Sequence, residues 1–174
     1  GLLVSNPMPQ HLADFHLHGL NCHIYSMAYI GGLTDTSSPI PMVPRVCEDG
    51  VHIVIFHGSI ASRDWNYRDR SLPLSPESLR DSGYNYLAMG HIHKKNSFRL
   101  GDSLILYPGL IEGKRFSDPG EGTFTVVTID EKETQIQEFP TNARPIRSIT
   151  IDVRDFDSQE ALENAIKAEG DERA

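Results

Sequence analysis

Three histidines follow the ends of two apolar segments of the 174-residue chain. His57 comes directly after the apolar run 51–56, and His91 and His93 come just after the run 84–89, in the stretch GHIH. Imidazole nitrogen is a common protein ligand for divalent transition metals. Layered α/β folds place their ligands in the loops just past strand ends. Each histidine alone could be a hydrogen-bonded loop residue, but the three together predict a metal site.

A second histidine pair lies near the start of the chain. Asp14, His16 and His18 look like the Asp-x-His-x-His opening of amidohydrolases and PHP-type phosphoesterases, where the motif ends an apolar strand. Here the motif falls at the end of a segment that we expect to be helical, so we predict these residues on or just after a helix, away from the first three histidines. We expect structural roles for His11, His23 and His52, and small buried side chains for Cys22 and Cys47.

Apolar periodicity and turn residues predict the elements that must position these side chains. Expected strands are 23–30, 51–56, 84–89, 104–107 and 145–153, with a hairpin of 122–129 and 134–139; expected helices are 7–17, 75–82 and 158–168. Residues 31–50 and 62–75 are expected to be loops. This order predicts a layered α/β domain over residues 1–144, followed by a small α+β unit over residues 145–174.

Charge is unevenly distributed along the chain. The net charge of −8 argues against a simple basic nucleic-acid binder, but residues 57–115 sum to +3. Lys94, Lys95 and Arg115 belong to that segment, and they could contact phosphate groups or form a solvated loop. No apolar run approaches the roughly 20 residues needed to span a bilayer, so no membrane association is expected. Two cysteines without a C-x-x-C spacing favour a reducing compartment, the cytoplasm.

A longer pattern around the GHIH stretch resembles a known family. The segments YNYLAMGHIHKKNSF and LILYPGLIEGKRFSDPGEGTFTVVTID look like the third quarter of a calcineurin-type metallophosphoesterase, and more narrowly of the SbcD-type DNA-repair nucleases. The family pattern matches at His57, His91, His93 and Tyr107-Pro108-Gly109, and it continues through the turn region around Glu112-Gly113 and Pro119-Gly120-Glu121. The resemblance spans about residues 20–168.

The resemblance implies a fold and a cofactor. The fold would be α/β (α+β): part of a layered metallophosphoesterase β-sandwich flanked by helices, with the start of a small α+β capping domain. The family binds two divalent ions, usually Mn²⁺, which share a bridging carboxylate. By resemblance His57 and His91 would bind one ion and His93 the other, and the pair would activate a water for attack on a phosphodiester. The implied partners are DNA and an SbcC-like SMC-type ATPase, with a possible homodimer.

The motifs of the family's first half do not occur here in order. These are Asp-x-His, Gly-Asp-x-x-Asp and Gly-Asn-His-Asp/Glu, which supply the bridging carboxylate and the catalytic histidine. We therefore expect the chain to be the carboxy-terminal portion of a metal-dependent phosphodiesterase, inactive by itself because its catalytic histidine lies elsewhere. Two alternatives stay open: a mononuclear zinc hydrolase that uses His91, His93 and a third histidine, or a non-catalytic interaction module.

Overall fold

A six-stranded mixed sheet forms the centre of the computed structural model. The structure describes residues 3–30, 39–60, 72–118, 120, 122–130, 133–141, 146 and 148–171. Its strands are β1 (Gln10–Leu17), β2 (Leu20–Ser26), β3 (Val51–His57), β4 (Ser59–Ile60), β5 (Pro73–Leu74), β6 (Tyr86–Gly90), β7 (Asn96–Leu100), β8 (Ser103–Tyr107), β9 (Thr123–Ile129) and β10 (Thr134–Pro140). Its helices are α1 (Pro76–Asp81), α2 (Gln159–Asp171) and a 3₁₀ turn at Val153–Asp155.

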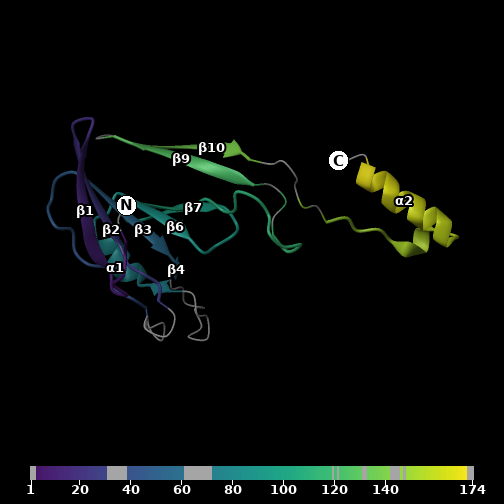
Figure 1. Ribbon diagram of the computed structural model, residues 1–174, viewed down its shortest axis with the longest axis horizontal. Helices are drawn as coiled ribbons and strands as arrows, with labels where there is room; N and C mark the ends of the chain where they lie inside the picture. The colour runs from purple at the N-terminus through teal and green to yellow at the C-terminus, as the bar shows by residue number, and fades with distance from the viewer. Residues whose placement is uncertain are drawn as a thin grey trace.

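The strand order of the sheet is β1-β2-β3-β6-β8-β7 (Figure 1). The four inner strands run parallel to one another, whereas β1 and β7 pair antiparallel at the two edges. Parallel strands all end on the same side of a sheet. The last residues of the inner strands therefore lie together at the ends of the strands, which we call the carboxyl edge: Ser26, His57, Gly90 and Tyr107. The predicted strands 51–56, 84–89 and 104–107 are confirmed.

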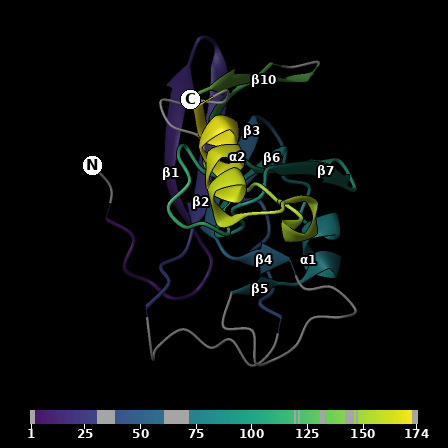
Figure 2. The ribbon, with the colours of Figure 1, turned by 90° about the vertical axis from the view of Figure 1, so that its right-hand side faces the viewer.

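The hydrophobic core lies on one face of this sheet. Tyr25, Val54, Leu87 and Ile105 are fully buried there. Helix α1 packs against this face through the buried Leu79, and the short parallel pair of β4 and β5 lies beside it (Figure 2). The predicted helix is confirmed, and the Ser75 hydroxyl accepts a hydrogen bond from the Ser78 amide that caps its first turn.

The β9–β10 hairpin lies over the opposite face of the sheet (Figure 1). The rings of Phe124 and Phe139 stack across the hairpin, with their centroids 5.0 Å apart. The alternating pattern predicts this hairpin, and the prediction is confirmed. Because Ile55 in β3 keeps 52% of its surface exposed, the hairpin covers this second face only in part.

The helix predicted over residues 7–17 is wrong. Residues Gln10–Leu17 form β1, which pairs with β2 through a two-residue turn at His18 and Gly19. Both turn residues have positive φ, 49° and 84°, as the tightest hairpins require. The strand lies at the sheet edge and buries little, so its sequence shows no clear period of two. Pairing with β2, rather than local propensity, determines its conformation.

Two further elements differ from the sequence prediction. Strand β7, at the other edge, is not predicted from the sequence, because its residues are mostly exposed and polar. No strand occurs among the described residues between 145 and 153, where one is predicted. Of the predicted loops, residues 31–38 and 62–71 lie outside the described residues.

The carboxy-terminal helix α2 is confirmed, and the Ser158 hydroxyl accepts a hydrogen bond from the Ala161 amide at its start. In Figure 1 the helix lies at the end of an extended segment, apart from the sheet. None of the described helices combines the length and apolarity that crossing a membrane requires.

Replacing Leu87 by alanine should destabilise the fold by about 2–5 kcal/mol, because it leaves a cavity in the fully buried centre of the sheet. Urea unfolding followed by circular dichroism measures this loss. The matched control is Leu3→Ala, at a leucine that is 90% exposed, which should change the free energy of unfolding by less than about 0.5 kcal/mol. Equal effects of the two substitutions would contradict the placement of the core.

Candidate metal centre

His57 and His91 meet at the carboxyl edge of the sheet. His57 ends β3 and pairs in register with Gly90, so that His91 follows directly beside it. The two imidazole rings lie edge to face, with centroids 5.4 Å apart and planes at 76°. A Cβ atom at Gly90 would lie 2.9 Å from Nδ1 of His57, so glycine is required to leave room for this ring. The expected convergence is therefore found for these two histidines.

The backbone of His91 adopts an unusual conformation. Its φ angle is 93°, a value that side-chain-bearing residues rarely adopt. Such strain costs on the order of 1–3 kcal/mol and persists where the surroundings hold the residue in place, often at functional sites. The surrounding structure therefore holds His91 in this conformation, with its imidazole against His57.

His93 is oriented by a carboxylate that no sequence motif identifies. Its Nδ1 lies 3.0 Å from Oδ1 of Asp118. The other oxygen, Oδ2, accepts hydrogen bonds of 2.8 Å from the backbone amides of Lys114 and Arg115. The hydrogen bond from His93, followed by that from Lys114, holds the pKa of Asp118 below its usual value. The ionised carboxylate thus keeps the proton on Nδ1 and leaves Nε2 with a lone pair, as metal-binding histidines require.

No local motif links Asp118 to His93, because 25 residues separate the two. The available signal is its position within the turn region of the family pattern, next to Pro119. The hydrogen bonds that its carboxylate accepts from the turn 114–118 become visible only once the loop is folded onto the sheet.

The Tyr107-Pro108-Gly109 motif fastens both histidine loops to the end of β8. The Tyr107 hydroxyl donates to the carbonyl of Gly58, 3.3 Å away and next to His57, and burial raises the pKa of Tyr107 to about 12. Gly109 has a φ of 78°, and a Cβ there would lie 3.1 Å from the His93 carbonyl oxygen. The motif therefore positions the histidines and does not itself provide reactive groups.

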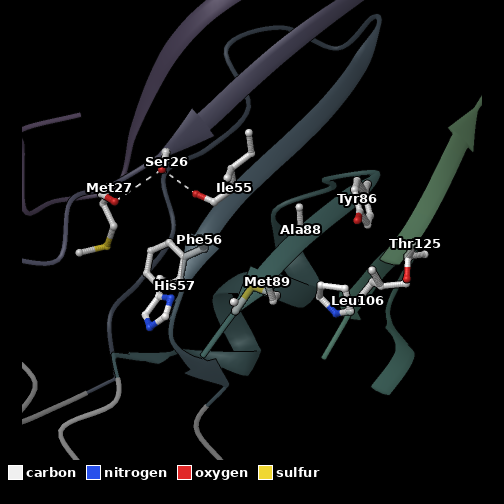
Figure 3. A pocket seen from close by; sticks show the side chains of 12 residues that line it. Ser26, Met27, Ile55, Phe56, His57, Tyr86, Ala88, Met89, Leu106 and Thr125 are labelled. Atoms are coloured by element: carbon white, nitrogen blue, oxygen red, sulfur yellow. Dashed lines mark hydrogen bonds between the residues drawn. The ribbon is translucent and has the colours of Figure 1, made fainter. Parts of the chain in front are cut away.

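A cavity of about 450 Å³ opens beside His57, between the second face of the sheet and β9 (Figure 3). Its walls are mostly apolar, and the Ser26 hydroxyl at its rim donates to the carbonyl of Ile55 over 2.6 Å. The lining residues are Ser26, Met27, Ile55, Phe56, His57, Tyr86, Ala88, Met89, Gly90, Leu106, Pro108 and Thr125. These described lining residues include no carboxylate, so they add no anionic ligand to the histidines.

The three basic residues predicted near the site differ in their surroundings. Lys95 forms an ion pair with Glu138 of β10, with 2.5 Å between Nζ and Oε2, which offsets its charge. Lys94 and Arg115 are exposed. Contact of any of the three with substrate stays a prediction.

The three predicted ligands do not surround a single point. Among the described residues, no group of three ligand atoms within 4.8 Å of one another includes His57, His91 or His93. This geometry does not provide the three-imidazole site that a mononuclear zinc hydrolase needs. It leaves a pair, His57 and His91, and a separate histidine held by Asp118.

The histidine motif of Asp14, His16 and His18 lies at the other end of the strands, opposite the carboxyl edge. Asp14 pairs with His23 and His16 with Asn21, toward the amino end of β2, and His18 lies in the turn. The prediction that they lie away from the His57 group is confirmed, and the predicted helix is wrong. Three residues interpreted as structural or buried from sequence come together near this edge: His23, Cys47 and His52. Both cysteines are half-buried rather than fully buried.

Comparison with known proteins gives the following similarities. The family described as the calcineurin-like phosphoesterase superfamily domain matches residues 11–132. The uncharacterized metallophosphoesterase YhaO of Bacillus subtilis strain 168 is 27% identical over 78 residues, which are 45% of this chain and 19% of YhaO. The crystal structure of TT1561 from Thermus thermophilus matches 74% of this chain and 57% of its own, with 10% identity and a TM-score of 0.39. The chain thus spans about a fifth of the length of YhaO.

Replacing Asp118 by asparagine should weaken divalent-metal binding at His93 about 10- to 100-fold, because the amide no longer fixes the proton on Nδ1. Long-range ¹H–¹⁵N spectra of the imidazoles should show the tautomer with the proton on Nδ1 in the parent chain and a loss of that preference in the variant. Asp155→Asn, at an exposed aspartate of the 3₁₀ turn, removes the same charge and is the control. An unchanged His93 tautomer in Asp118→Asn would contradict the assigned role.

Asp118 should also make stability depend on pH. Its pKa in the folded chain is below the ordinary value of 3.8, so the ionised carboxylate stabilises the fold above that pH. This contribution should disappear as the pH falls through the lowered folded pKa. Urea midpoints measured from pH 7 to pH 2.5 should show a constant gap between the parent chain and Asp118→Asn down to about pH 4, then a closing gap. A gap that widens in acid would contradict the sign.

Proposed function

Because the chain belongs to the calcineurin-like phosphoesterase superfamily, we propose that His57, His91 and His93 form part of the metal centre of a metal-dependent phosphodiesterase. Members of this superfamily hydrolyse phosphoesters with divalent metal ions. The observation that carries the proposal is the meeting of His57 and His91 at the carboxyl edge, beside a third histidine whose Nε2 is left available by Asp118.

The residues present fit two ions better than one. His57 and His91 have rings 5.4 Å apart and can share one ion, whereas His93 is held separately by its own carboxylate and would bind another. Three imidazoles are neutral ligands, so they do not offset the repulsion between two dications. A bridging carboxylate must therefore come from residues outside these three, and we propose that it comes from outside this chain. Nitrogen and oxygen ligands of this kind suit Mn²⁺.

The bound ions would supply activation of a water and neutralisation of charge on the phosphate. The chain's own contribution is to hold the ligands still. The strained backbone at His91 fixes one imidazole, Tyr107 holds the backbone next to His57, and Asp118 fixes the tautomer of His93. Preorganised ligands of this kind need little rearrangement during the reaction.

A nucleic-acid phosphodiester is the substrate that we propose. The support is the resemblance to SbcD-type nucleases and the local charge of +3 over residues 57–115, in a chain whose net charge is −8. Two exposed cations of this segment, Lys94 and Arg115, follow the three histidines in sequence. In this proposal the whole protein acts on DNA in the cytoplasm with an SbcC-like SMC-type ATPase, and a homodimer is possible within the same arrangement.

The test uses Mn²⁺ titrations against bis-p-nitrophenyl phosphate and linear DNA. The complete product of the gene that encodes these residues should hydrolyse both, and His91→Ala should lower kcat at least about 10³-fold. His18→Ala, at the turn on the opposite edge, is the matched control and should leave the rate unchanged. Hydrolysis of phosphomonoesters but of neither diester would reject the nuclease proposal and keep the phosphoesterase proposal. A His91→Ala variant as active as the parent would reject the proposed metal centre.

The 174-residue chain by itself should show little or no turnover in the same assays. The described residues that line the cavity beside His57 include no carboxylate that would hold two dications together, and the sequence has no Asn-His pair of the family type. Strong Mn²⁺-dependent turnover by this chain, abolished by His91→Ala, would show that these histidines are sufficient for the chemistry.

A further inference from the structure

A cluster of metal-ligating side chains lies at the edge of the sheet opposite His57. The ligand atoms of His23, Cys47 and His52 all lie within 4.8 Å of one another. His23 and His52 are register partners on the parallel strands β2 and β3, and their rings stack with centroids 4.6 Å apart. Cys47, in the loop that leads into β3, places its Sγ 3.2 Å from Nε2 of His23. The sheet therefore holds two of the three ligands rigidly.

A carboxylate orients His23 toward this cluster. Nδ1 of His23 lies 2.6 Å from Oδ1 of Asp14 on β1, and Nε2 of His11 lies 2.7 Å from the same oxygen. The hydrogen bond from His23 is the largest cause that lowers the pKa of Asp14 below its usual value, and the hydrogen bond from His11 is the next. An ionised Asp14 keeps the proton of His23 on Nδ1, so the lone pair of Nε2 points to the Cys47 sulfur. Carboxylate, imidazole and open nitrogen in this order are the usual support of a zinc-binding histidine.

His52 is fully buried. Burial lowers its pKa, and its two nitrogens face the Tyr25 hydroxyl at 2.8 Å from Nδ1 and the Asp49 carbonyl at 3.1 Å from Nε2. The Tyr25 hydroxyl also accepts from the amide of Val46, next to Cys47. A cation at Nε2 would move the ring proton to Nδ1, where the Tyr25 oxygen can accept it. The neutral ring therefore has a ready path to act as a ligand.

An aspartate and a glycine follow Cys47 in the loop that leads into β3. The Cys47 thiol donates to the backbone carbonyl of Asp49 over 3.4 Å, and the hydrogen bond with this thiol is the main cause that lowers the pKa of Asp49. Gly50 follows with a φ of 85°, and a Cβ there would lie 2.9 Å from Nε2 of His23. A side chain at this position would therefore crowd Nε2 of His23.

We propose that His23, Cys47 and His52 bind a Zn²⁺ ion. Two imidazoles and one thiolate suit zinc better than a hard cation such as Mn²⁺ or Mg²⁺. On binding, the thiol proton of Cys47 leaves to solvent and the sulfur takes the metal as thiolate. The ion would join the loop before β3 to β2 and β3. The site is independent of the function proposed for His57, His91 and His93, from which it is separated by the length of the strands.

The same residues could be taken for a nucleophile, because Cys47, His23 and Asp14 form a thiol–imidazole–carboxylate chain. Burial, the largest cause, raises the pKa of the Cys47 thiol, which opposes a reactive thiolate at neutral pH. The second imidazole, His52, has no place in such a chain but completes a metal site. A dication is also the group that would make the thiolate stable here.

Alkylation of the two cysteines gives the first test. Iodoacetamide should modify Cys47 at least about ten times more slowly when Zn²⁺ is present, while the modification rate of Cys22, an internal control on β2, stays the same. The modified residues are identified by peptide mass. Equal protection of both cysteines, or none, would overturn the proposal.

Co²⁺ substitution gives the second test, because thiolate ligation adds a near-ultraviolet charge-transfer band. The band should appear with about one Co²⁺ per chain, disappear in Cys47→Ser, and persist in Cys22→Ser and His91→Ala. The proposed ligands at the carboxyl edge are imidazoles, so Co²⁺ binding there cannot produce the thiolate charge-transfer band. Zn²⁺ binding with the same affinity and stoichiometry in Cys47→Ser as in the parent chain would overturn the proposal.

The Tm of thermal unfolding distinguishes metal binding by these three side chains from their simple closeness in the fold. Zn²⁺ well above its dissociation constant should raise the Tm of the His91→Ala variant by about 5 °C or more, and it should leave that of the His91→Ala/Cys47→Ser double variant unchanged. Asp14→Asn tests the positioning carboxylate: it should weaken Zn²⁺ binding about 10-fold while the cobalt–thiolate band persists. A Tm shift of equal size in the double variant would show that the thiol takes no part.

Discussion

Parallel pairing of β2, β3, β6 and β8 places both histidine groups of this molecule. It aligns His57 with Gly90 at one edge and His23 with His52 toward the other. A slip of one residue would turn the side chains of a strand to the opposite face and would separate both groups. The register is maintained by the core face, where Val54, Leu87 and Ile105 pack as neighbours on successive strands.

The two ends of the strands provide different chemical environments. At the carboxyl edge the three histidines are exposed, and His93 has a buried carboxylate partner. Toward the amino edge His52 is fully buried and His23 nearly so, and a thiol lies within hydrogen-bond distance. Exposed imidazoles suit ions that must also reach a substrate and additional ligands. Buried imidazoles with a thiol suit an ion that holds the chain together.

In both groups a carboxylate acts through a histidine. Asp118 fixes the proton of His93, and Asp14 that of His23, each on Nδ1. Both aspartates come from an element other than the one that carries their histidine: a loop after β8 in one case and β1 in the other. The geometry of each group therefore depends on how separate segments pack. If either aspartate moved away, its histidine would lose a hydrogen bond, and the ring proton would no longer be fixed on Nδ1.

Local sequence signals were enough to predict the buried inner strands, the capped helix α1, the β9–β10 hairpin and the position of His57, His91 and His93 after strand ends. Continuous apolar runs, a Ser-Pro-Glu cap and a Gly-His-x-His stretch are recognisable without the fold. Tertiary contacts made Gln10–Leu17 a strand, because the partner that satisfies its backbone is β2. They also brought Asp118 to His93 and Cys47 to His23, across 25 and 24 residues. Contacts at such separations depend on how the loops close over the sheet, and no local pattern of residues encodes that closure.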